Sequence, residues 1–480
     1  MISEWSMDKL HEECAVFGVS TNLDEAAGIT YNGLLAMQHR GQEGAGIAVT
    51  KGHAILYHKN VGLVSEVFTK EVMEKMPKSN LAVGHTRYST TGSNTIHNVQ
   101  PFVTEFLTGR IATVHNGNVV NAKGIKEQLE NCGLDFSATS DSEVISSLIA
   151  YKTVKEGSVE KGVVAAAKKL MGAFSLIVLS GEHKLIALRD ANGFRPLCIG
   201  ENQYGMAIAS ESCALDSCGF DFIRDVKPGE MLVIENGEIT SSEIVLHSER
   251  QGLCIFEYVY FARTDSVIDN LSVYEARNNM GMILAREDAA RFRKGEFKAD
   301  VVCGVPDSGL EAAEGYAAES GIPFASGFVK NRYIGRSFIY PTQTQRENAV
   351  KLKLNPLSLH IKDKSIVLVD DSIVRGTTSA KLIQNLRNAG AREVHMRISS
   401  PPFLHTCHFG TDIDKEENLI ANQMSIEEIR QQIGADTLEF ISIDGLKEAC
   451  KKSDMPFCTG CFTGDYGMQI GDYSKRELEK

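Results

Sequence analysis

VLVDDSIVRGTT, residues 367–378, joins a short apolar run to the start of an amphipathic segment that stops at Gly390. The apolar run predicts a buried strand, and its end delivers two adjacent carboxylates, Asp370 and Asp371. The residues that then open the helix are Ser372, Gly376, Thr377 and Thr378. Backbone N–H groups at such a helix start suit a phosphate, and paired carboxylates suit sugar hydroxyls or hydrated Mg²⁺. A plain turn, in which aspartate and serine cap the helix, remains the simpler interpretation.

The same order of strand, loop and helix occurs earlier in the second half of the chain. ADVVCGVPDSG (299–309) and LEAAEGYAAES (310–320) read as strand, loop and helix, and IPFASGF (322–328) reads as the next strand. Such units build a parallel sheet that binds ligands at the carboxyl ends of its strands. Between the units, residues 330–358 are polar and basic without clear periodicity, which is typical of a functional lid or a disordered excursion.

The first half of the chain has a different pattern of short β-type runs separated by turn residues. The runs include CAVFGVS (14–20), GIAVT (46–50), HAILYHK (53–59), LAVGHTRY (81–88) and RIATVHNG (110–117), with four more after residue 173. Two helical patterns, residues 140–152 and 159–171, interrupt them. Strands, then helices, then strands again predict a layered α+β domain.

Composition limits the class of protein. A chain of 480 residues is long enough for two to four domains. Lys and Arg number 50 against 62 Asp and Glu, and this acidic balance argues against nucleic acid or an anionic membrane as a partner. The first 14 residues lack a signal-peptide core, and no apolar run reaches the roughly 20 residues that span a bilayer. We therefore expect a cytoplasmic protein, in which 11 cysteines are reduced thiols, metal ligands or a nucleophile.

The 367–378 loop resembles the phosphoribosyl-pyrophosphate (PRPP) motif of type I phosphoribosyltransferases. The resemblance implies that Asp370 and Asp371 hold the ribose hydroxyls and Mg²⁺, and that residues 372–378 cradle the 5′-phosphate. The cradle then consists of Ser372, Arg375, Gly376, Thr377 and Thr378. PDSG (306–309) resembles the family's pyrophosphate loop, with Ser308 near the metal.

The basic segment that follows resembles the flexible loop that closes over PRPP in the same family. Lys330 and Tyr333 are its implied PRPP-binding residues. A lid makes physical sense because a reacting ribosyl centre must be shielded from water. A solvated basic loop is the alternative.

Five elements of the first half occur together and in order. They are HEECAVFGVS (11–20), HRGQEGAGI (39–47), GHTRYSTTG (84–92), HNGN (115–118) and TSDSE (139–143). Together they resemble the class II glutamine amidotransferase domain of the N-terminal-nucleophile (Ntn) hydrolases, with a buried structural thiol as the alternative for Cys14 alone. The resemblance implies that Cys14 attacks the glutamine amide while Asn116 and Gly117 form the oxyanion hole. It also implies that Arg87 binds the substrate carboxylate and Asp141 its ammonium group.

An N-terminal nucleophile needs a free α-amino group, which titrates near pH 8 and acts as the base. Cys14 therefore serves only after cleavage between Glu13 and Cys14, and we predict that residues 1–13 are a propeptide. One position departs from the family pattern, because Ala15 stands where the family usually has glycine.

The remaining cysteine pattern is Cys458-x-x-Cys461, which alone is ambiguous between zinc, a redox dithiol and an iron–sulfur ligand pair. With Cys254 in LCIFEYVYFAR and Cys407 in PPFLHTCHFGTD, it resembles the [4Fe-4S] branch of the amidophosphoribosyltransferases. The resemblance implies that these four cysteines hold the cluster, with structural zinc as the alternative. The other cysteines are expected to be ordinary thiols: Cys132, Cys198, Cys213, Cys218, Cys303 and Cys450.

The resemblance to that family extends from Cys14 to about residue 470. It implies an αββα Ntn glutaminase domain at 14–245, then an α/β type I phosphoribosyltransferase domain with a parallel sheet and the cluster ligands at 246–480. The implied reaction converts glutamine, PRPP and water to 5-phosphoribosylamine, glutamate and pyrophosphate. Mg²⁺, feedback inhibition by purine nucleotides and a homo-oligomer (dimer or tetramer) are implied as well.

Two other functions stay open at this point. One is a different class II glutamine amidotransferase that shares only the first half of the chain. The other is a catalytically silent regulator that binds PRPP and carries the cluster.

Overall fold

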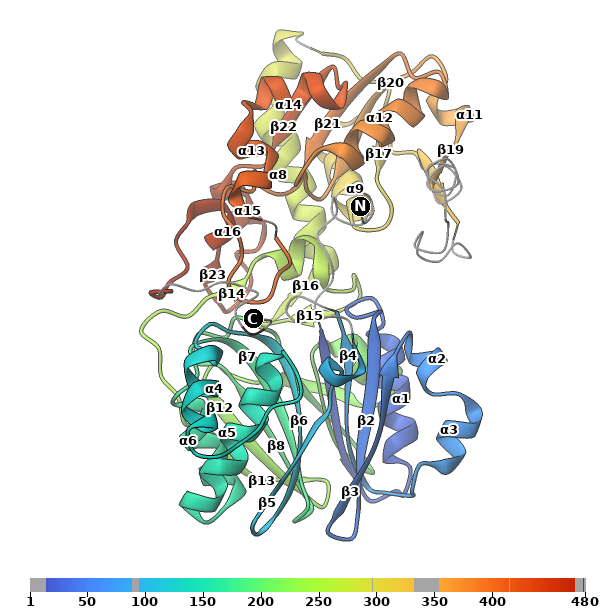
Figure 1. Ribbon diagram of the computed structural model, residues 1–480. Coiled ribbons are helices and arrows are strands. Elements are labelled where there is room, and N and C mark those ends of the chain that lie inside the picture. The colour runs from blue at the N-terminus through green and yellow to red at the C-terminus, as the bar shows by residue number, and fades with distance from the viewer. Residues whose placement is uncertain are drawn as a thin grey trace.

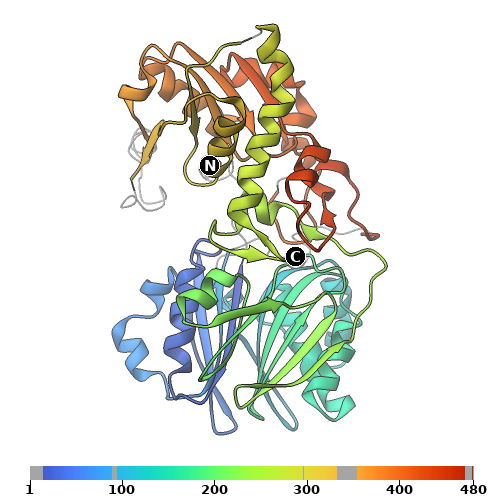
Figure 2. The same ribbon diagram turned by 180° about the vertical axis from the view of Figure 1, so that it is seen from behind.

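The computed structural model describes residues 14–88, 95–295, 297–331, 354–413, 415–470 and 478. The chain forms two lobes, and the long helix α8 (Val273–Lys294) belongs to the second, where it runs through the upper lobe of Figure 2 down to the junction with the lower one. In the described part of the chain, no helix combines the length and the apolar character that a membrane crossing requires.

The first lobe contains two antiparallel sheets packed face to face (Figure 1). The seven-stranded sheet has the order β11 (Asp221–Asp225), β9 (Cys198–Asn202), β10 (Gly205–Ala209), β1 (Ala15–Thr21), β4 (Leu81–Arg87), β2 (Gly44–Lys51) and β3 (Ala54–Val61). The six-stranded sheet has the order β13 (Glu238–Ile244), β12 (Glu230–Glu235), β8 (Lys184–Arg189), β7 (Gly172–Ser180), β6 (Gly109–Val119) and β5 (Phe102–Phe106). Their inner faces share one apolar core, which includes the buried side chains of Val16, Val83, Val114 and Ile177.

Helices cover the outer faces of both sheets. The first sheet is covered by α1 (Ala26–Ala36), α2 (Val64–Val67), α3 (Lys70–Lys75) and α7 (Ser212–Ser217). The second is covered by α4 (Ala122–Glu130), α5 (Asp141–Glu156) and α6 (Val159–Ala167). Each helix layer buries a core of its own, so the lobe has four layers, and the predicted αββα sandwich is confirmed.

The second lobe is built on a parallel sheet, as the strand–loop–helix pattern predicts. Its order is β17 (Val301–Gly304), β20 (Ser365–Asp370), β21 (Glu393–Ile398) and β22 (Thr437–Phe440). The helices that pack around this sheet are α8, α9 (Gly309–Ser320), α12 (Thr377–Asn388) and α14 (Ile426–Ile433). Since neighbouring strands run in the same direction, the loops after β17 and β20 leave the sheet at the same edge.

One predicted strand is wrong. Residues 322–327 make only an isolated bridge, between Val302 and Phe324, and Phe328 then begins β18 (Phe328–Lys330), which pairs antiparallel with β19 (Leu354–Pro356). Pro323 lacks the N–H that a continuous ladder requires. The edge strand on the other side is β22, which the sequence pattern did not predict.

The remaining elements are short. The helices are α11 (Ser358–Ile361), α13 (Ile420–Gln423), α15 (Ile443–Ala449) and α16 (Gly460–Thr463), with a π-helical turn at Glu257–Phe261 and 3₁₀ turns at Ile96–Asn98 and Glu416–Asn418. The strands form two pairs: β14 (Leu253–Cys254) with β23 (Phe457–Cys458), and β15 (Val267–Ile268) with β16 (Leu271–Ser272). The β14–β23 pair brings the C-terminal segment back to the junction of the lobes (Figure 1).

Candidate functional site

Cys14 lies immediately before β1, at the end of the first sheet where Arg40 bonds both the Cys14 carbonyl oxygen and Glu257 of the second half of the chain. Its thiol donates a hydrogen bond to the carbonyl oxygen of Tyr88 at 3.5 Å. Its own carbonyl oxygen accepts a hydrogen bond from Nε of Arg40 at 3.3 Å. Both contacts fix the backbone and the sulfur of the predicted nucleophile at a strand end rather than inside a core.

Three charged side chains, Arg87, Asp141 and Glu43, lie close enough to act on the Cys14 sulfur. Burial raises the pKa of the Cys14 thiol, whereas Arg87 lowers this pKa and Asp141 raises it. Arg87 is itself buried at the end of β4, and burial lowers the pKa of its guanidinium. The predicted nucleophile and the two predicted glutamine-binding residues are therefore brought together from three separate elements.

The predicted oxyanion residues, Asn116 and Gly117, lie in β6 of the second sheet. Asn116 is buried, and its side-chain amide nitrogen has no hydrogen-bond partner among the described residues. Gly117 has φ of 143°, and a Cβ there would lie 2.1 Å from the carbonyl oxygen of Ala173. Only glycine fits at this point, and the buried amide donor beside it is available to a ligand.

Asp141 is the first residue of α5, after the N-cap Ser140. Its Oδ2 accepts a hydrogen bond from the backbone N–H of Val119 at 2.9 Å. Because Val119 ends β6, this bond ties the start of the helix to the strand that carries Asn116 and Gly117.

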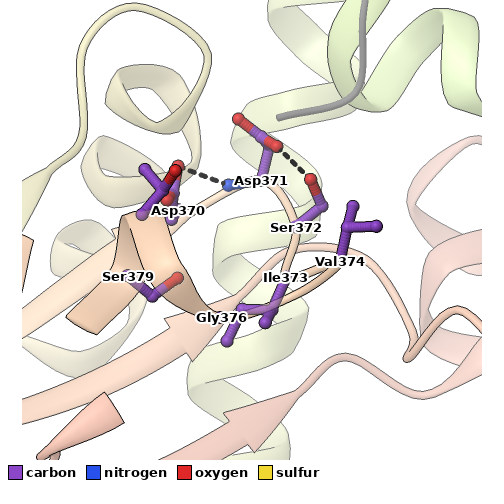
Figure 3. Close-up of a pocket in the computed structure, with 8 residues that line it drawn as sticks. Asp370, Asp371, Ser372, Ile373, Val374, Gly376 and Ser379 are labelled. Carbon is purple, nitrogen blue, oxygen red and sulfur yellow. Dashed lines mark hydrogen bonds between the residues drawn. The ribbon is translucent and has the colours of Figure 1, made fainter. Parts of the chain in front are cut away.

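The phosphate-type loop connects β20 to α12 and is shown in Figure 3. Asp370 and Asp371 are both buried, and Oδ1 of Asp370 accepts the backbone N–H of Asp371 at 3.0 Å. The residues that line a pocket here are Asp370, Asp371, Ser372, Ile373, Val374, Gly376, Thr378 and Ser379. Arg375 lies in the same loop, and Thr377 begins α12.

The helix start does not have the geometry of an ordinary side-chain cap. Gly376 occupies the N-cap position in the left-handed region, with φ of 82°, and no side chain caps the helix. The alternative in which aspartate and serine serve only as caps is therefore wrong. Gly376, Thr378 and Ser379 at this helix start line the pocket, and a helix N-terminus favours a phosphate.

The loop after β17 lies beside this pocket. Ser308 donates a hydrogen bond from Oγ to Oδ2 of Asp371 at 2.5 Å, so two predicted metal-site residues meet directly. Lys330, at the end of β18, donates to the carboxylate of Asp307. Of the predicted lid, Tyr333 falls outside the described residues, as do residues 332–353 in general.

The four predicted cluster cysteines converge between the lobes. Cys254 in β14 and Cys458 in β23 are register partners, and Cys461 lies in α16 directly after β23. Burial raises the pKa of Cys461 well above the usual value, and Cys254, Cys407 and Cys458 each raise it further. Burial also raises the pKa of Cys254 to about 12 and that of Cys458 to about 11. Four thiols from distant parts of the sequence thus lie within electrostatic reach of one another.

All 11 cysteines lie in the described part of the chain and are free thiols. Within those residues, no three His, Cys, Asp or Glu side chains are gathered closely enough to hold a single metal ion. Tetrahedral zinc at a Zn–S distance of about 2.3 Å would require sulfur atoms only about 3.8 Å apart.

The loop after Cys407 contacts the strand that carries the predicted oxyanion residues. Nδ2 of Asn118 donates to the carbonyl oxygen of His408 at 2.7 Å. A Cβ on Gly410 would lie 3.3 Å from the carbonyl carbon of Gly117, so the two backbones nearly touch. The cysteine group and the Cys14 group are thus adjacent across the lobe junction.

A buried ion-pair network at the same junction was not predicted from the sequence. Arg40 pairs with Glu257 at 2.9 Å and with Glu211 at 2.6 Å, and Arg195 pairs with Glu257 at 3.3 Å. The partners are 62 to 217 residues apart, a separation that leaves no local pattern. HRGQ and CIFEYVYFAR, however, contain Arg40 and Glu257.

Comparisons with known proteins cover both lobes. A glutamine amidotransferase domain model matches residues 85–217, and a phosphoribosyl transferase domain model matches residues 272–399. Amidophosphoribosyltransferase from Archaeoglobus fulgidus is 45% identical over 460 residues, which cover 95% of this chain and 98% of that protein.

Two solved structures are similar over nearly the whole chain. One, described as the allosteric regulatory enzyme of purine biosynthesis, is 43% identical with a TM-score of 0.89 and covers 97% of this chain and 99% of its own. The other is the glutamine PRPP amidotransferase from B. subtilis in complex with ADP and GMP; it is 43% identical with a TM-score of 0.87 and covers 96% of this chain and 99% of its own.

The residues around Cys14 and the pocket at Asp370 and Asp371 agree with this similarity over the full length. The chain therefore belongs to the amidophosphoribosyltransferase family.

Proposed function

We propose that the chain hydrolyses glutamine at Cys14 and transfers the ammonia to PRPP in the second lobe, giving 5-phosphoribosylamine, glutamate and pyrophosphate. One observation carries the proposal: a complete set of glutaminase residues and a complete PRPP loop occur in one chain whose whole length matches amidophosphoribosyltransferases. The reaction is the committed step of purine synthesis in this family.

In the first half-reaction, the Cys14 sulfur forms a bond to the side-chain carbonyl carbon of glutamine. The C–N bond breaks, and ammonia leaves with the proton that came from the thiol. Asn116 and Gly117 donate to the oxyanion, an interaction worth several kcal/mol in enzymes generally. Arg87 binds the substrate carboxylate and Asp141 the ammonium group. Water then hydrolyses the thioester to glutamate and restores the thiol.

The active nucleophile requires removal of residues 1–13. In the full chain the nitrogen of Cys14 is in a peptide bond with Glu13 and has no basic lone pair. After cleavage, the new α-amino group takes the thiol proton, as in other N-terminal nucleophiles. The residues concerned lie outside the described part of the chain, and mass measurement tests this step.

In the second half-reaction, ammonia forms a bond to C1 of the ribose while the C1–O bond to pyrophosphate breaks, and the new C1–N nitrogen passes one proton to the departing pyrophosphate. Asp370 and Asp371 hold the ribose hydroxyls, and Ser372, Arg375, Gly376, Thr377 and Thr378 cradle the 5′-phosphate. Lys330, together with Tyr333, belongs to a lid that excludes water from C1.

Mg²⁺ fits the oxygen-rich edge of the PRPP pocket. Buried carboxylates of Asp370 and Asp371 and the hydroxyl of Ser308 form a hard oxygen donor set, which suits Mg²⁺ with water and phosphate as its other ligands. Bound there, the ion would neutralise charge on the departing pyrophosphate.

The cysteine group fits a [4Fe-4S] cluster. Cys254, Cys407, Cys458 and Cys461 supply four thiols, of which Cys407 is buried and the others half-buried, and four thiols are the donor set of such a cluster. The cluster would link the C-terminal segment to the core.

Regulation and assembly extend the proposal. The B. subtilis relative was solved with ADP and GMP, which supports feedback inhibition of this chain by purine nucleotides. We infer a homo-oligomer, either dimer or tetramer, and a cytoplasmic location, where free thiols persist.

Substitution of Cys14 tests whether glutamine hydrolysis and the reaction of ammonia with PRPP take place at separate sites. Cys14→Ser with its propeptide removed, and Cys14→Ala, should lose glutamine-dependent synthesis by at least about 10³-fold and keep ammonia-dependent synthesis. Asn202→Ala, at the far end of the same sheet, is the control. Loss of both activities in a folded variant would contradict the two-site division.

The same assay separates the two alternatives. A different class II amidotransferase would show no release of pyrophosphate from PRPP, and the full-length similarity already argues against it. A silent regulator would bind PRPP without turnover from either nitrogen source.

A further inference from the structure

Two buried side-chain amides, neither of which belongs to a motif named above, support the residues around Cys14 that are proposed to bind glutamine. Asn98 and Gln100 are 1% and 4% exposed, and both lie in the segment between the loop after β4 and the start of β5. Each bonds the chain next to a residue that contacts glutamine in the proposed function.

Gln100 bonds the backbone of His115, the residue before Asn116. Its Oε1 accepts the His115 N–H at 2.6 Å, and its Nε2 donates to the His115 carbonyl oxygen at 3.0 Å. The backbone pairing of β5 with β6 ends at Phe102 and Thr113. The Gln100 amide therefore continues that pairing by two residues, up to the oxyanion position.

Gln100 also reaches the helix that begins at Asp141. Nε2 donates to Oγ of Ser142 at 3.1 Å, and the same hydroxyl lies 3.1 Å from Nδ1 of His115. One side-chain amide thus fixes the distance between β6 and the first turn of α5.

Asn98 makes the equivalent pair of bonds to Thr139. Its Oδ1 accepts the Thr139 N–H at 2.9 Å, and its Nδ2 donates to the Thr139 hydroxyl at 3.0 Å. Thr139 stands two residues before Asp141, so Asn98 sets the path of the chain into the helix that carries the ammonium-binding carboxylate.

The segment is itself held from the opposite side. Lys59 in β3 donates to the carbonyl oxygens of Val99 and Pro101, which flank Gln100. A Cβ on Gly46 would lie 2.1 Å from the carbonyl oxygen of Gln100, so β2 leaves no room for the segment to retreat. Held on both sides, Asn98 and Gln100 have the fixed supports that an accurate site requires.

We propose that Gln100 is a positioning residue for the oxyanion pair Asn116 and Gly117, and that Asn98 is a positioning residue for Asp141. The inference rests on the proposed function, because it assumes that glutamine binds beside Cys14. It predicts that Gln100 affects mainly the kcat of glutamine hydrolysis, whereas Asn98 affects mainly the KM for glutamine. Oxyanion donors act in the transition state, whereas an ammonium contact acts on bound substrate as well.

The experiment is steady-state glutamine hydrolysis by the processed full-length enzyme. Gln100→Ala should lower kcat about 10- to 100-fold with KM within about twofold, since a misplacement of about 1 Å costs up to that factor. Asn98→Ala should raise KM about tenfold with kcat within about threefold, the size of one charged hydrogen bond. Ammonia-dependent synthesis should be unchanged in both variants.

Asn202→Ala is the control for the loss of a side-chain amide away from the site. Asn202 in β9 also donates from its side-chain amide to a backbone carbonyl, that of Gly219 at 3.0 Å, but it lies at the end of the sheet away from Cys14. If Gln100→Ala does not fold, Gln100→Glu replaces it, because this variant keeps the volume and the acceptor for His115 and loses both donors.

A lower kcat in Gln100→Ala together with a higher KM in Asn98→Ala supports the inference; this pattern is called the kinetic split below. Wild-type constants in folded variants, or equal changes of kcat and KM in both, would overturn it. Cys14→Ala separates this inference from the proposed function. If Cys14→Ala still hydrolyses glutamine, the proposed function fails; if it does not and the split is absent, only the positioning roles fail.

Discussion

Asn118 donates a hydrogen bond from its side-chain amide to the carbonyl oxygen of His408 at 2.7 Å, across 290 residues of sequence. The first residue lies one position after the predicted oxyanion glycine, and the second directly follows the predicted cluster ligand Cys407. This bond therefore joins the strand that carries Asn116 and Gly117 to the loop that follows Cys407. The close approach of Gly410 to Gly117 is a second contact between the same two segments.

Asn118→Ala should weaken the junction of the lobes. It removes this donor from the half-buried His408 carbonyl, and the loss of one such hydrogen bond costs about 1 kcal/mol. We expect both unfolding transitions in scanning calorimetry to move down by several degrees, because the bond joins the two lobes. Asn121→Ala is the control, since its amide bridges Lys169 and Met171 within the first lobe alone. If Asn118→Ala and Asn121→Ala both lowered only the same one of the two transitions, and by the same amount, Asn118 would not link the lobes.

Acid should destabilise the first lobe through two buried histidines. Burial lowers the pKa of His85 well below 6.5 and also lowers that of His115, so both are neutral when folded and take up protons on unfolding. Their contribution is complete above pH 6.5 and is lost as the pH falls, by up to about 1.4 kcal/mol per pH unit for each histidine.

Urea unfolding from about pH 7 to about pH 5.5 measures this slope. His85→Gln should make it shallower, whereas His247→Gln, at an exposed position, should leave it unchanged. An identical slope in His85→Gln and the parent protein would contradict the assignment to His85.

The sequence predicted the layers of the fold better than it predicted single elements. Helix α1 was missed because it has no side-chain N-cap, no acid in its first turn, and glycines at 28 and 33. Gly33 is there for packing, since a Cβ would lie 2.5 Å from the ring of Phe17. Residues 322–327 failed as a strand for the opposite reason: the apolar pattern is present, but Pro323 lacks the N–H that a continuous ladder requires.

Among the residues of the site, too, the sequence predicted those in local motifs and missed those whose contacts are distant in sequence. Motif residues such as Asp370 and Ser308 were predicted because they stand next to a strand end, where local pattern carries information. Gln100 and Asn98 were not, because an amide that bonds a backbone group 15 or 41 residues away has no spacing signal. Supporting residues of this kind are found only when distant segments are placed side by side.

Intact mass of the purified enzyme should correspond to a chain that begins at Cys14. The lost segment carries Glu4, Asp8, Glu12 and Glu13 against Lys9, so the net charge moves from −12 to −9. It also carries Trp5, the only tryptophan, so the mature enzyme should have no tryptophan fluorescence. A full-length chain with full glutaminase activity would contradict the N-terminal nucleophile.

Asp371→Asn should abolish synthesis from both glutamine and ammonia. Asp371 accepts Ser308 and faces the pocket, and removal of a group that holds developing charge costs about 10²–10³-fold. Basal glutamine hydrolysis should remain, because Cys14 is in the other lobe. Asp300→Asn is the control: this carboxylate accepts the N–H of Ser365 at 2.8 Å, at the opposite edge of the same sheet. Equal losses in the two variants would point to folding rather than to PRPP binding.

Iron analysis tests the cysteine group with a matched pair of serine variants. The processed enzyme should contain about four iron and four sulfide per chain with broad visible absorption. Cys458→Ser should lose most of both, because Cys458 is the register partner of Cys254 and the pair holds the C-terminal segment. Cys450→Ser should keep them. Cys450 is also a free thiol in the second lobe, but burial alone raises its pKa, with no contribution from another cysteine. Zinc in place of iron would exclude the cluster, and equal iron loss from both variants would mean that the thiols act only by packing.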